Sequence, residues 1–447
     1  MRPIFIFPGA LLLLLVGCVP VAQQGGSNRA TDYYSEKRLR FRNYVYEEAI
    51  QTPLLYPADP ERTNIRGDTD PRRMLEDPVL MLGTPEALRL EFDELGDQYQ
   101  NYFVKLIHCN GDWKKSLLND IEFLFEYNRF LIDDYEISIN TRLPYIHYRF
   151  TVPPVKVSGN YLVVVYRESD ERDVILTRRF VVYENELSIQ PEVRFSTGIA
   201  ERPTHQQVDF QVFYPQMNLI NPQLNMRAVV RQNGRWDNAL DLKPLFFDPN
   251  ERRLDYRYFD LENNFRGGNE YRNADLRSIR FQGQGVGRVQ RADDRVDLYL
   301  NPDAVRRQTV YTQLIDINGR FVIENFEQER GAGEADYVYT HFSVRTPPVE
   351  GDVYVFGQLT GWDTSDEARM QYVPERNAYE TTLLLKQGFY NYLYAIRRPD
   401  GTLDEQHFEG SYNITENEYE IIMYYRDPTT RADRVVGYTS LKYFGRN

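Results

Sequence analysis

The feature that most constrains the fold is a short-range alternation of apolar and polar residues. In ALRLEFDEL, residues 87–95, Leu88, Leu90 and Phe92 alternate with charged residues. Successive side chains of a strand point to opposite faces, so this pattern is typical of a half-buried β-strand. Turn signals such as Ser158-Gly159-Asn160 separate the runs. Further strands are expected in NYFVKLIHC, EISIN, YIHYRFTV, NYLVVVYR and ILTRRFVVYE. Short strands with regular punctuation, in a chain with 34 Tyr and 25 Phe, favour β-sandwiches.

Two further blocks repeat this pattern. One contains QVDFQVFYPQ and NMRAVVRQNGRW, in which Asn233-Gly234 is a hairpin signal. The other contains NAYETTLLLKQGFYNYLYAI and follows the linker Thr346-Pro347-Pro348. In residues 117–127, LLNDIEFLFEY, the apolar residues are bunched, which leaves helix and loop both open. The sequence therefore predicts a mostly β chain of tandem immunoglobulin-like β-sandwich domains at 76–185, 186–345 and 346–447.

The N-terminus predicts export. MRPIFIFPGALLLLLVGC has an apolar run from Leu11 to Val16, followed by Gly17-Cys18, as in a secretory signal peptide. Its last four residues resemble the lipobox of bacterial lipoproteins, in which the cysteine carries the lipid. The run is far shorter than the roughly 20 residues that span a bilayer. We therefore expect a lipoprotein signal peptide at 1–17, lipidation at Cys18, and a tether and N-terminal arm at 18–75.

Charge and cysteine content argue against a nucleic-acid-binding protein and against a disulfide-stabilised one. The formal net charge is −13, from 53 basic and 66 acidic residues, and no basic stripe is present to neutralise phosphates. A nucleic-acid partner is therefore not expected. If Cys18 carries lipid, Cys109 has no partner for an intramolecular disulfide. The chain must then be held together by hydrophobic cores.

The segment HCNGDW, residues 108–113, invites a catalytic interpretation. On a strand, however, the adjacent His108 and Cys109 point to opposite faces, whereas a nucleophilic pair must approach to roughly 3 Å. A Cys109 nucleophile paired with His147 or His205 stays open, but a buried free thiol is the default prediction.

Other catalytic and metal-site patterns are missing from the sequence. The five His lack the spacing of metal-binding motifs, so neither a metal nor another cofactor is predicted. No phosphate loop, GxSxG or dinucleotide motif occurs. Carboxylate pairs for glycoside hydrolysis are not excluded, yet no feature selects one. We predict that the protein is not an enzyme.

Residues 77–184 resemble the first domain of the plug protein of the bacterial type IX secretion system. The order and spacing of several short segments carry the resemblance. These segments are HCNGDW at 108–113, Ser116-Leu117-Leu118, Glu126-Tyr127, Ile139-Asn140-Thr141, Tyr145-Ile146-His147-Tyr148, Ser158-Gly159-Asn160-Tyr161, Thr177-Arg178-Arg179-Phe180 and the later His205-Gln206-Gln207-Val208-Asp209. In this family HCNGDW is a structural hallmark, which implies structural roles for His108, Cys109, Asn110, Gly111, Asp112 and Trp113. Asn110-Gly111 suits a tight turn, and Trp113 would anchor it.

The resemblance also implies a function. Such a protein would be a non-catalytic periplasmic cap that closes a giant outer-membrane β-barrel translocon by steric occlusion. A lipid at Cys18 would hold it at the outer membrane. Loop residues are plausible anchors of the interface, and FRGGNEYR offers Phe265, Arg266 and Arg272 as candidate partner contacts. A merely solvated loop is the alternative interpretation.

The last block resembles glycogen- and starch-binding sandwich modules. VYVFGQLTGWD and NAYETTLLLKQGFYNYLYAI carry this likeness, and Trp362 matches the turn tryptophan of those modules. Where they often have a sugar platform, this chain has Tyr379 in a polar segment, which puts glycan binding in doubt. The alternative function is therefore a carbohydrate-binding lipoprotein that uses Trp362 and Tyr379. For Trp362 a core position is the default prediction, because a shared fold does not carry function.

Overall fold

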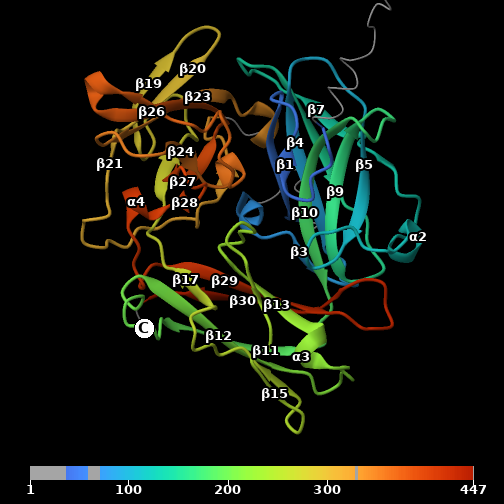
Figure 1. Ribbon diagram of the computed structural model, residues 1–447. Coiled ribbons are helices and arrows are strands. Elements are labelled where there is room, and N and C mark those ends of the chain that lie inside the picture. The colour runs from blue at the N-terminus through green and yellow to red at the C-terminus, as the bar shows by residue number, and fades with distance from the viewer. Residues whose placement is uncertain (1–36, 59–70, 328–330, 446–447) are drawn as a thin grey trace, which may run out of the picture. The chain divides into compact units, whose positions relative to one another are not determined.

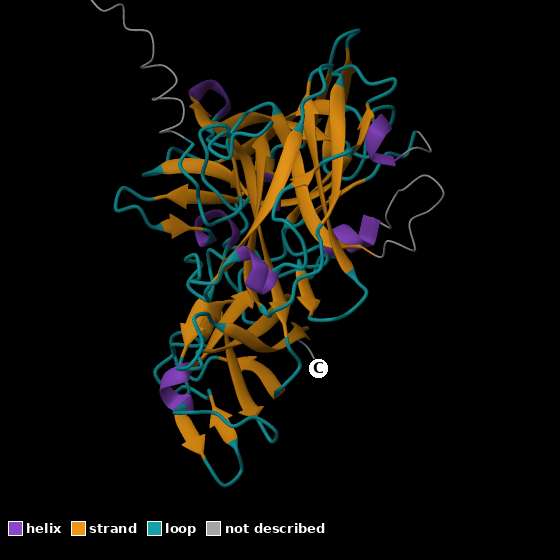
Figure 2. Ribbon diagram, turned by 90° about the vertical axis from the view of Figure 1, so that its right-hand side faces the viewer, coloured by secondary structure: helices purple, strands orange, loops and turns teal. Residues whose placement is uncertain are grey.

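The alternating runs of the sequence form strands in the computed structural model, which describes residues 37–58, 71–327 and 331–445 (Figure 1). All elements named below lie in one compact unit that begins at Leu39. Helices are few and short, and strands dominate (Figure 2). The predicted mostly β class, with several antiparallel sheets packed as sandwiches, is confirmed.

The first module is a sandwich built from residues 44–183. Its six-stranded sheet contains, in order, β1 (Tyr44–Val45), β10 (Val174–Tyr183), β9 (Gly159–Arg167), β5 (Tyr102–Cys109) and β6 (Phe130–Leu131), with β3 (Val79–Met81) parallel to β10. Its four-stranded sheet contains β2 (Ile50–Ala58), β4 (Ala87–Leu95), β8 (Tyr145–Thr151) and β7 (Asp134–Ile137). The inward-facing positions of the alternating runs, such as Leu90 and Val163, form the core between the sheets. Two short helices complete the module, η1 (Pro71–Leu75, a 3₁₀ helix) and α2 (Asp120–Phe123).

The second module combines residues that lie far apart in the sequence. Its five-stranded sheet contains β11 (Ser188–Phe195), β12 (His205–Phe213), β16 (Arg253–Asp255) and β15 (Phe246–Asp248), with β17 (Asn264–Arg266) also paired to β12. Its four-stranded sheet contains β14 (Leu240–Leu242), β13 (Met226–Gln232), β29 (Asn417–Tyr425) and β30 (Arg434–Tyr443). A short helix, α3 (Pro222–Asn225), precedes β13. The C-terminal strands therefore complete this module.

The third module is organised around β27 (Gly388–Arg397). This strand pairs with β18 (Arg272–Asp275), β22 (Phe321–Ile323), β24 (Asp352–Phe356) and β28 (Leu403–Asp404). The facing sheet contains β19 (Val286–Arg291), β20 (Val296–Leu300), β23 (Tyr337–Arg345), β26 (Ala378–Lys386) and β25 (Gln371–Val373), with β21 (Asp303–Ala304) beside β23. The short helices of this region are η2 (Gly331–Glu334), η3 (Gln358–Thr360), η4 (Pro374–Arg376) and α4 (Gln406–Glu409).

The strand pairing departs from the ranges expected from the sequence. β2 lies in the expected N-terminal arm, 18–75, yet it is a full strand of the first module. The expected domains 186–345 and 346–447 exchange strands, because β29 pairs with β13 whereas β18 and β22 pair with β27. Alternation identifies a strand and its apolar face, but it does not identify the strand beside it. Among the described strands, every pairing stays within residues 44–183 or within 188–443.

The outer sheet faces of the first module are covered by the other two modules. The six-stranded sheet contributes Ile107 and Val164 to an apolar cluster with Val229 and Ile422 of the second module. On the opposite side, Leu54 of β2 joins the apolar core of the third module. Burying both faces removes apolar surface from water and holds the modules against one another.

Candidate functional site

The hallmark segment HCNGDW begins at the end of β5, where its first two side chains diverge. His108 lies in the first module, with Nδ1 2.9 Å from Ser116 Oγ and Nε2 3.2 Å from the carbonyl oxygen of Ser158. Cys109 lies on the other side of the sheet, in the apolar cluster shared with the second module. Burial raises the pKa of the Cys109 thiol to about 12. The two side chains are therefore separated by the sheet and do not form a nucleophilic pair.

The turn after Cys109 binds the second module through its backbone. The Gly111 N–H donates to Asp433 Oδ2 at 2.9 Å, and the Asp433 N–H donates to Asn110 Oδ1 at 3.1 Å. A Cβ on Gly111 would lie 3.0 Å from the ring of Tyr424, so a larger residue would crowd this contact. Asp112 lies at the exposed side, where its carboxylate accepts from the Lys114 N–H at 3.1 Å. The tight turn is therefore a docking element between modules.

Trp113 completes this junction. Its ring meets Trp236 edge to face, with ring centroids 4.8 Å apart. The guanidinium of Arg179 lies 4.2 Å from the centroid of the Trp113 ring. Aromatic pairs and cation–π contacts of this kind stabilise a buried junction by about 1 kcal/mol each. HCNGDW therefore lies at a junction between modules, and its two candidate reactive side chains, His108 and Cys109, are buried.

The loop that follows the hallmark exposes four large apolar side chains. The exposed fractions are 72% for Leu117, 78% for Ile121, 68% for Phe125 and 82% for Tyr127. We call residues 117–127 the apolar loop. It contains α2 and lies outside β5, on the flank of the first module (Figure 1). Sequence reasoning singled out this segment only as helix or loop. Its bunched apolar residues, which fit no strand period, were the signal that could have revealed an exposed surface.

The apolar loop is held from beneath by its own neighbours. Phe123 and Leu124 are buried in the core of the first module. The side chain of Asn128 bonds both backbone groups of Leu106, each at 2.8 Å. Lys156 Nζ donates to the carbonyl oxygen of Ile121 at 2.9 Å. These contacts fix the backbone of the loop while its apolar side chains face solvent.

Two of the three candidate contacts at 265–272 lie inside the fold. Phe265 is 5% exposed and packs against Tyr419, with ring centroids 5.3 Å apart. Arg272 is also buried, with Nε 2.9 Å from Glu409 and Nη1 2.7 Å from Asp303. Arg266 alone is exposed. The segment crosses from β17 of the second module to β18 of the third, so its apolar and ionic groups are used for packing.

Trp362 and Tyr379, the two rings proposed for carbohydrate binding, also contact other residues of the fold. Trp362 packs edge to face on Phe356, and the guanidinium of Arg235 covers its ring at 4.4 Å. Tyr379 is buried, and its hydroxyl accepts from the Val349 N–H at 3.0 Å. A sugar would have to displace Arg235 to stack on that face of Trp362, and Tyr379 offers no open face. The glycan-binding alternative therefore gains no ready site from these residues.

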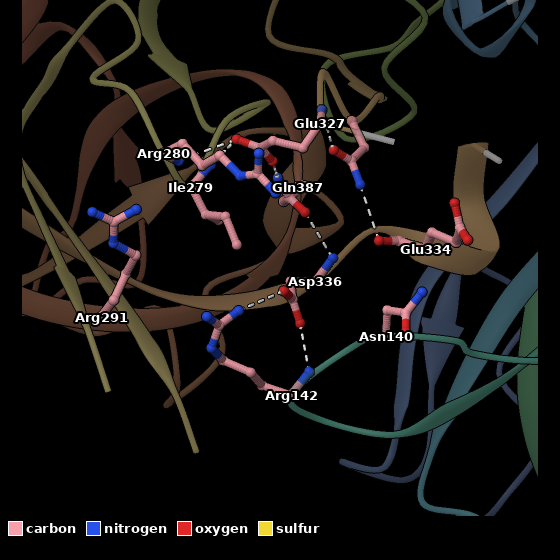
Figure 3. Close-up of a pocket in the computed structure, with 10 residues that line it drawn as sticks. Asn140, Arg142, Ile279, Arg280, Arg291, Glu327, Glu334, Asp336 and Gln387 are labelled. Carbon is pink, nitrogen blue, oxygen red and sulfur yellow. Dashed lines mark hydrogen bonds and ion pairs between the residues drawn. The ribbon is translucent and has the colours of Figure 1, made fainter. Parts of the chain in front are cut away.

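A polar pocket of about 250 Å³ lies where the first module meets the third (Figure 3). Arg142 contacts Asp336 through its backbone N–H at 2.7 Å and its guanidinium at 3.0 Å. Gln387 accepts from the Asp336 N–H at 2.9 Å and donates to Glu327 at 2.9 Å. Because these groups satisfy one another, this part of the pocket is a polar seam between modules, and Arg280 and Arg291 also line the pocket.

Within the described ranges, no three His, Cys, Asp or Glu side chains gather in a way that could hold a metal ion. In the same residues, no helix has the length and apolar character needed to cross a bilayer. Cys18 lies outside the described residues, so its lipidation stays a prediction.

The comparisons with known proteins agree with the hallmark and the fold. The family model "Type 9 secretion system plug protein 1st domain" matches residues 60–184, a range that includes both the hallmark and the apolar loop. The crystal structure of a hypothetical protein from Parabacteroides merdae, determined at 2.30 Å resolution, is similar with a TM-score of 0.83 and 32% sequence identity. The match covers 91% of this chain and 100% of that chain. Among curated proteins no match is found. Residues 60–184 are therefore a first domain of the type IX secretion system plug protein kind.

Proposed function

We propose that this protein closes the outer-membrane translocon of type IX secretion from the periplasmic side, by steric occlusion and without catalysis. The match of residues 60–184 to the plug family carries this proposal. The buried junctions between modules support it, because a stopper must resist deformation when it covers a pore. The partner would be the giant outer-membrane β-barrel of the secretion system.

A buried ionic cluster between the first and third modules supports the idea of a single stiff body. Asp93 of β4 accepts from His147 Nδ1 at 2.7 Å, from Lys386 Nζ at 2.6 Å and from the Tyr337 hydroxyl at 2.5 Å. Burial by itself would raise the pKa of Asp93, but the charge of Lys386 and the hydrogen bond from His147 outweigh it and lower the pKa. Separating the modules would leave these charges without partners, which is costly.

The location follows from the same proposal. A lipid on Cys18 would tether the protein to the outer membrane and raise its local concentration beside the barrel. Replacing Cys18 with Ser is expected to move the protein from the membrane fraction to the soluble periplasmic fraction and to abolish incorporation of an alkyne-labelled fatty acid. Unchanged labelling of the C18S variant would contradict the anchor without touching the proposed occlusion.

The central experiment is affinity capture of the tagged protein from detergent-solubilised outer membranes, followed by mass spectrometry. We expect recovery of one very large β-barrel by the folded protein and none by heat-unfolded protein. The barrel, reconstituted alone in a planar bilayer, should conduct ions, and adding the protein to the periplasmic side should lower that conductance. Capture without a barrel partner would contradict the proposed function.

A further inference from the structure

We infer that the apolar loop, residues 117–127, is the surface through which this protein binds its partner, and that its apolar side chains enter a concave apolar recess of a protein. This inference rests on the proposed function, since the partner is taken to be the translocon. Beyond the proposed function, it identifies the surface of this protein that makes the contact and the chemistry of the partner surface that receives it.

The loop exposes a large amount of apolar surface within a short stretch of chain. Single exposed apolar residues are normal on protein surfaces, whereas a cluster of them is typical of an interaction site. Leu117, Ile121, Phe125 and Tyr127 are all at least 68% exposed within one short loop. A buried aromatic side chain alone covers about 150–250 Å². These four side chains can therefore supply the centre of an interface that buries about 800 Å² on each partner.

The backbone of the loop is already ordered before a partner binds. Phe123 and Leu124 fill the core beneath it, so the exposed side chains cannot rotate inward without opening the module. Lys156 holds the loop backbone at Ile121, and Asn128, the residue after the loop, is bonded to the backbone of Leu106 in β5. Binding through a pre-ordered surface costs little conformational entropy, which favours affinity.

The charge of the loop favours a protein recess over a lipid surface as its binding partner. An apolar loop that binds an anionic bilayer is typically accompanied by an excess of Lys and Arg. The loop itself contains three acidic residues, Asp120, Glu122 and Glu126, and no basic one, and Lys114, Lys115 and Arg129 on its flanks bring the formal charge of residues 114–129 to zero. Glu122 is also paired with Arg431, and Lys156 is held near the ring of Phe125 at 5.2 Å. The loop and its flanks therefore lack an excess of basic residues and do not favour an anionic membrane.

The shape of the loop also favours a recess. The loop lies outside β5 on the flank of the first module (Figure 1), and Glu122 in it pairs with Arg431 of the connection between β29 and β30. A convex apolar element buries its sides as well as its tip only when the opposite surface is concave. An apolar recess in the wall or rim of the partner fits this requirement.

The test uses the full chain with two pairs of substitutions. The seat variant is Ile121→Asp with Phe125→Asp. The matched control is Phe259→Asp with Phe281→Asp, because these rings are 82% and 75% exposed elsewhere in the molecule. Affinity for the solubilised barrel is measured for each protein, and circular dichroism and thermal unfolding verify that both variants keep the wild-type fold. We expect the dissociation constant to rise by roughly 30-fold or more for the seat variant and by less than about threefold for the control.

Each other outcome has a definite meaning. If the wild type and the seat variant capture the barrel equally well, the seat is elsewhere and the proposed function stands. If the wild type captures no barrel, the proposed function fails, and the inference fails with it. A flotation assay with vesicles of phosphatidylethanolamine and phosphatidylglycerol completes the set. Binding of the wild type to these vesicles, lost in the seat variant, would overturn the protein recess in favour of a lipid surface.

Discussion

At the residue scale, two buried carboxylates show how surroundings decide the role of a charge. Asp93 has three donors and a pKa below its ordinary range, so it is an ionised structural group. Glu270 is 1% exposed, and its Oε2 has no hydrogen-bond partner among the described residues. Burial, reinforced by the nearby charge of Asp316 and opposed by the hydrogen bond from Tyr311, raises the pKa of Glu270 to about 7. The two sites therefore predict different consequences of substitution.

Replacing Lys386 with Met should destabilise the junction between the first and third modules. The variant leaves Asp93 buried without its closest charge partner, and breaking a buried pair typically costs about 3–5 kcal/mol. Arg369→Met is the matched control, because its pair with Asp352 is exposed and should contribute less than about 1 kcal/mol. Urea unfolding measures both free energies. A loss below 1 kcal/mol in K386M would contradict the structural role of the cluster.

Replacing Glu270 with Gln should remove a pH dependence of stability. The pKa of Glu270 is higher in the folded protein than its ordinary value of 4.5, so the folded state holds a proton that the unfolded state has released. Wild-type stability should therefore fall as the pH rises from about 4.5 to 7, by up to ~3 kcal/mol from this group. Urea unfolding at pH 5 and pH 8 should show a smaller fall for E270Q. Equal falls in the two proteins would contradict the assignment.

At the element scale, the end of β5 and the start of β9 form one structural unit. The imidazole of His108 lies directly against Gly159, so that a Cβ at this position would lie 2.2 Å from Nε2 of His108. Its φ of 152° is also a conformation that favours glycine. His108 is thus clamped between Ser116 and the backbone at residues 158–159, which positions the hallmark turn against the second module.

Replacing Gly159 with Ala should destabilise the first module by at least ~2 kcal/mol, because the clash with His108 adds to the backbone strain. Gly96→Ala separates these two effects. Gly96 has a φ of 127° and no atom within 4 Å of a Cβ, so its substitution should cost only about 1 kcal/mol. Tryptophan fluorescence, to which Trp113 and Trp236 of the junction contribute, is followed during urea unfolding. Equal losses in the two variants would show that strain alone is responsible.

At the scale of the whole molecule, the second and third modules are interwoven while the first is separate in sequence. The chain enters the third module at β18, completes it at β28, and returns to the second module with β29 and β30. Because β29 lies between β13 and β30, removing it would expose one face of the second core. The C-terminal residues are thus essential to a module that begins near residue 188.

This interweaving predicts the behaviour of fragments. Residues 346–447 expressed alone lack β13, β18, β20 and β23, so they should show no cooperative unfolding transition. Residues 186–447 contain every described strand pairing of the second and third modules and should unfold cooperatively. Circular dichroism during thermal unfolding distinguishes these results. A cooperative transition in the shorter fragment would contradict the pairing of β13 with β29.

The sequence by itself determined the class of fold, the positions of many strands and the match of residues 60–184 to the first domain of the plug proteins. The run ALRLEFDEL is β4 residue for residue, and the adjacency of His108 and Cys109 was enough to predict that their side chains diverge. These features are local, since they depend on the side-chain period of a strand and on the residues beside it in the chain.

Only the tertiary structure decided which surfaces are covered. Phe265 and Arg272, predicted as partner contacts, and Tyr379, predicted as a sugar platform, are buried in the structure. Leu117 and Tyr127 are exposed to solvent. The tertiary structure also placed β29 beside β13, almost 200 residues away in the chain. The physical reason is that an apolar side chain has the same local pattern whether a neighbouring module, a partner protein or nothing covers it. Exposure depends on contacts between distant segments, and those form only when the whole chain has folded.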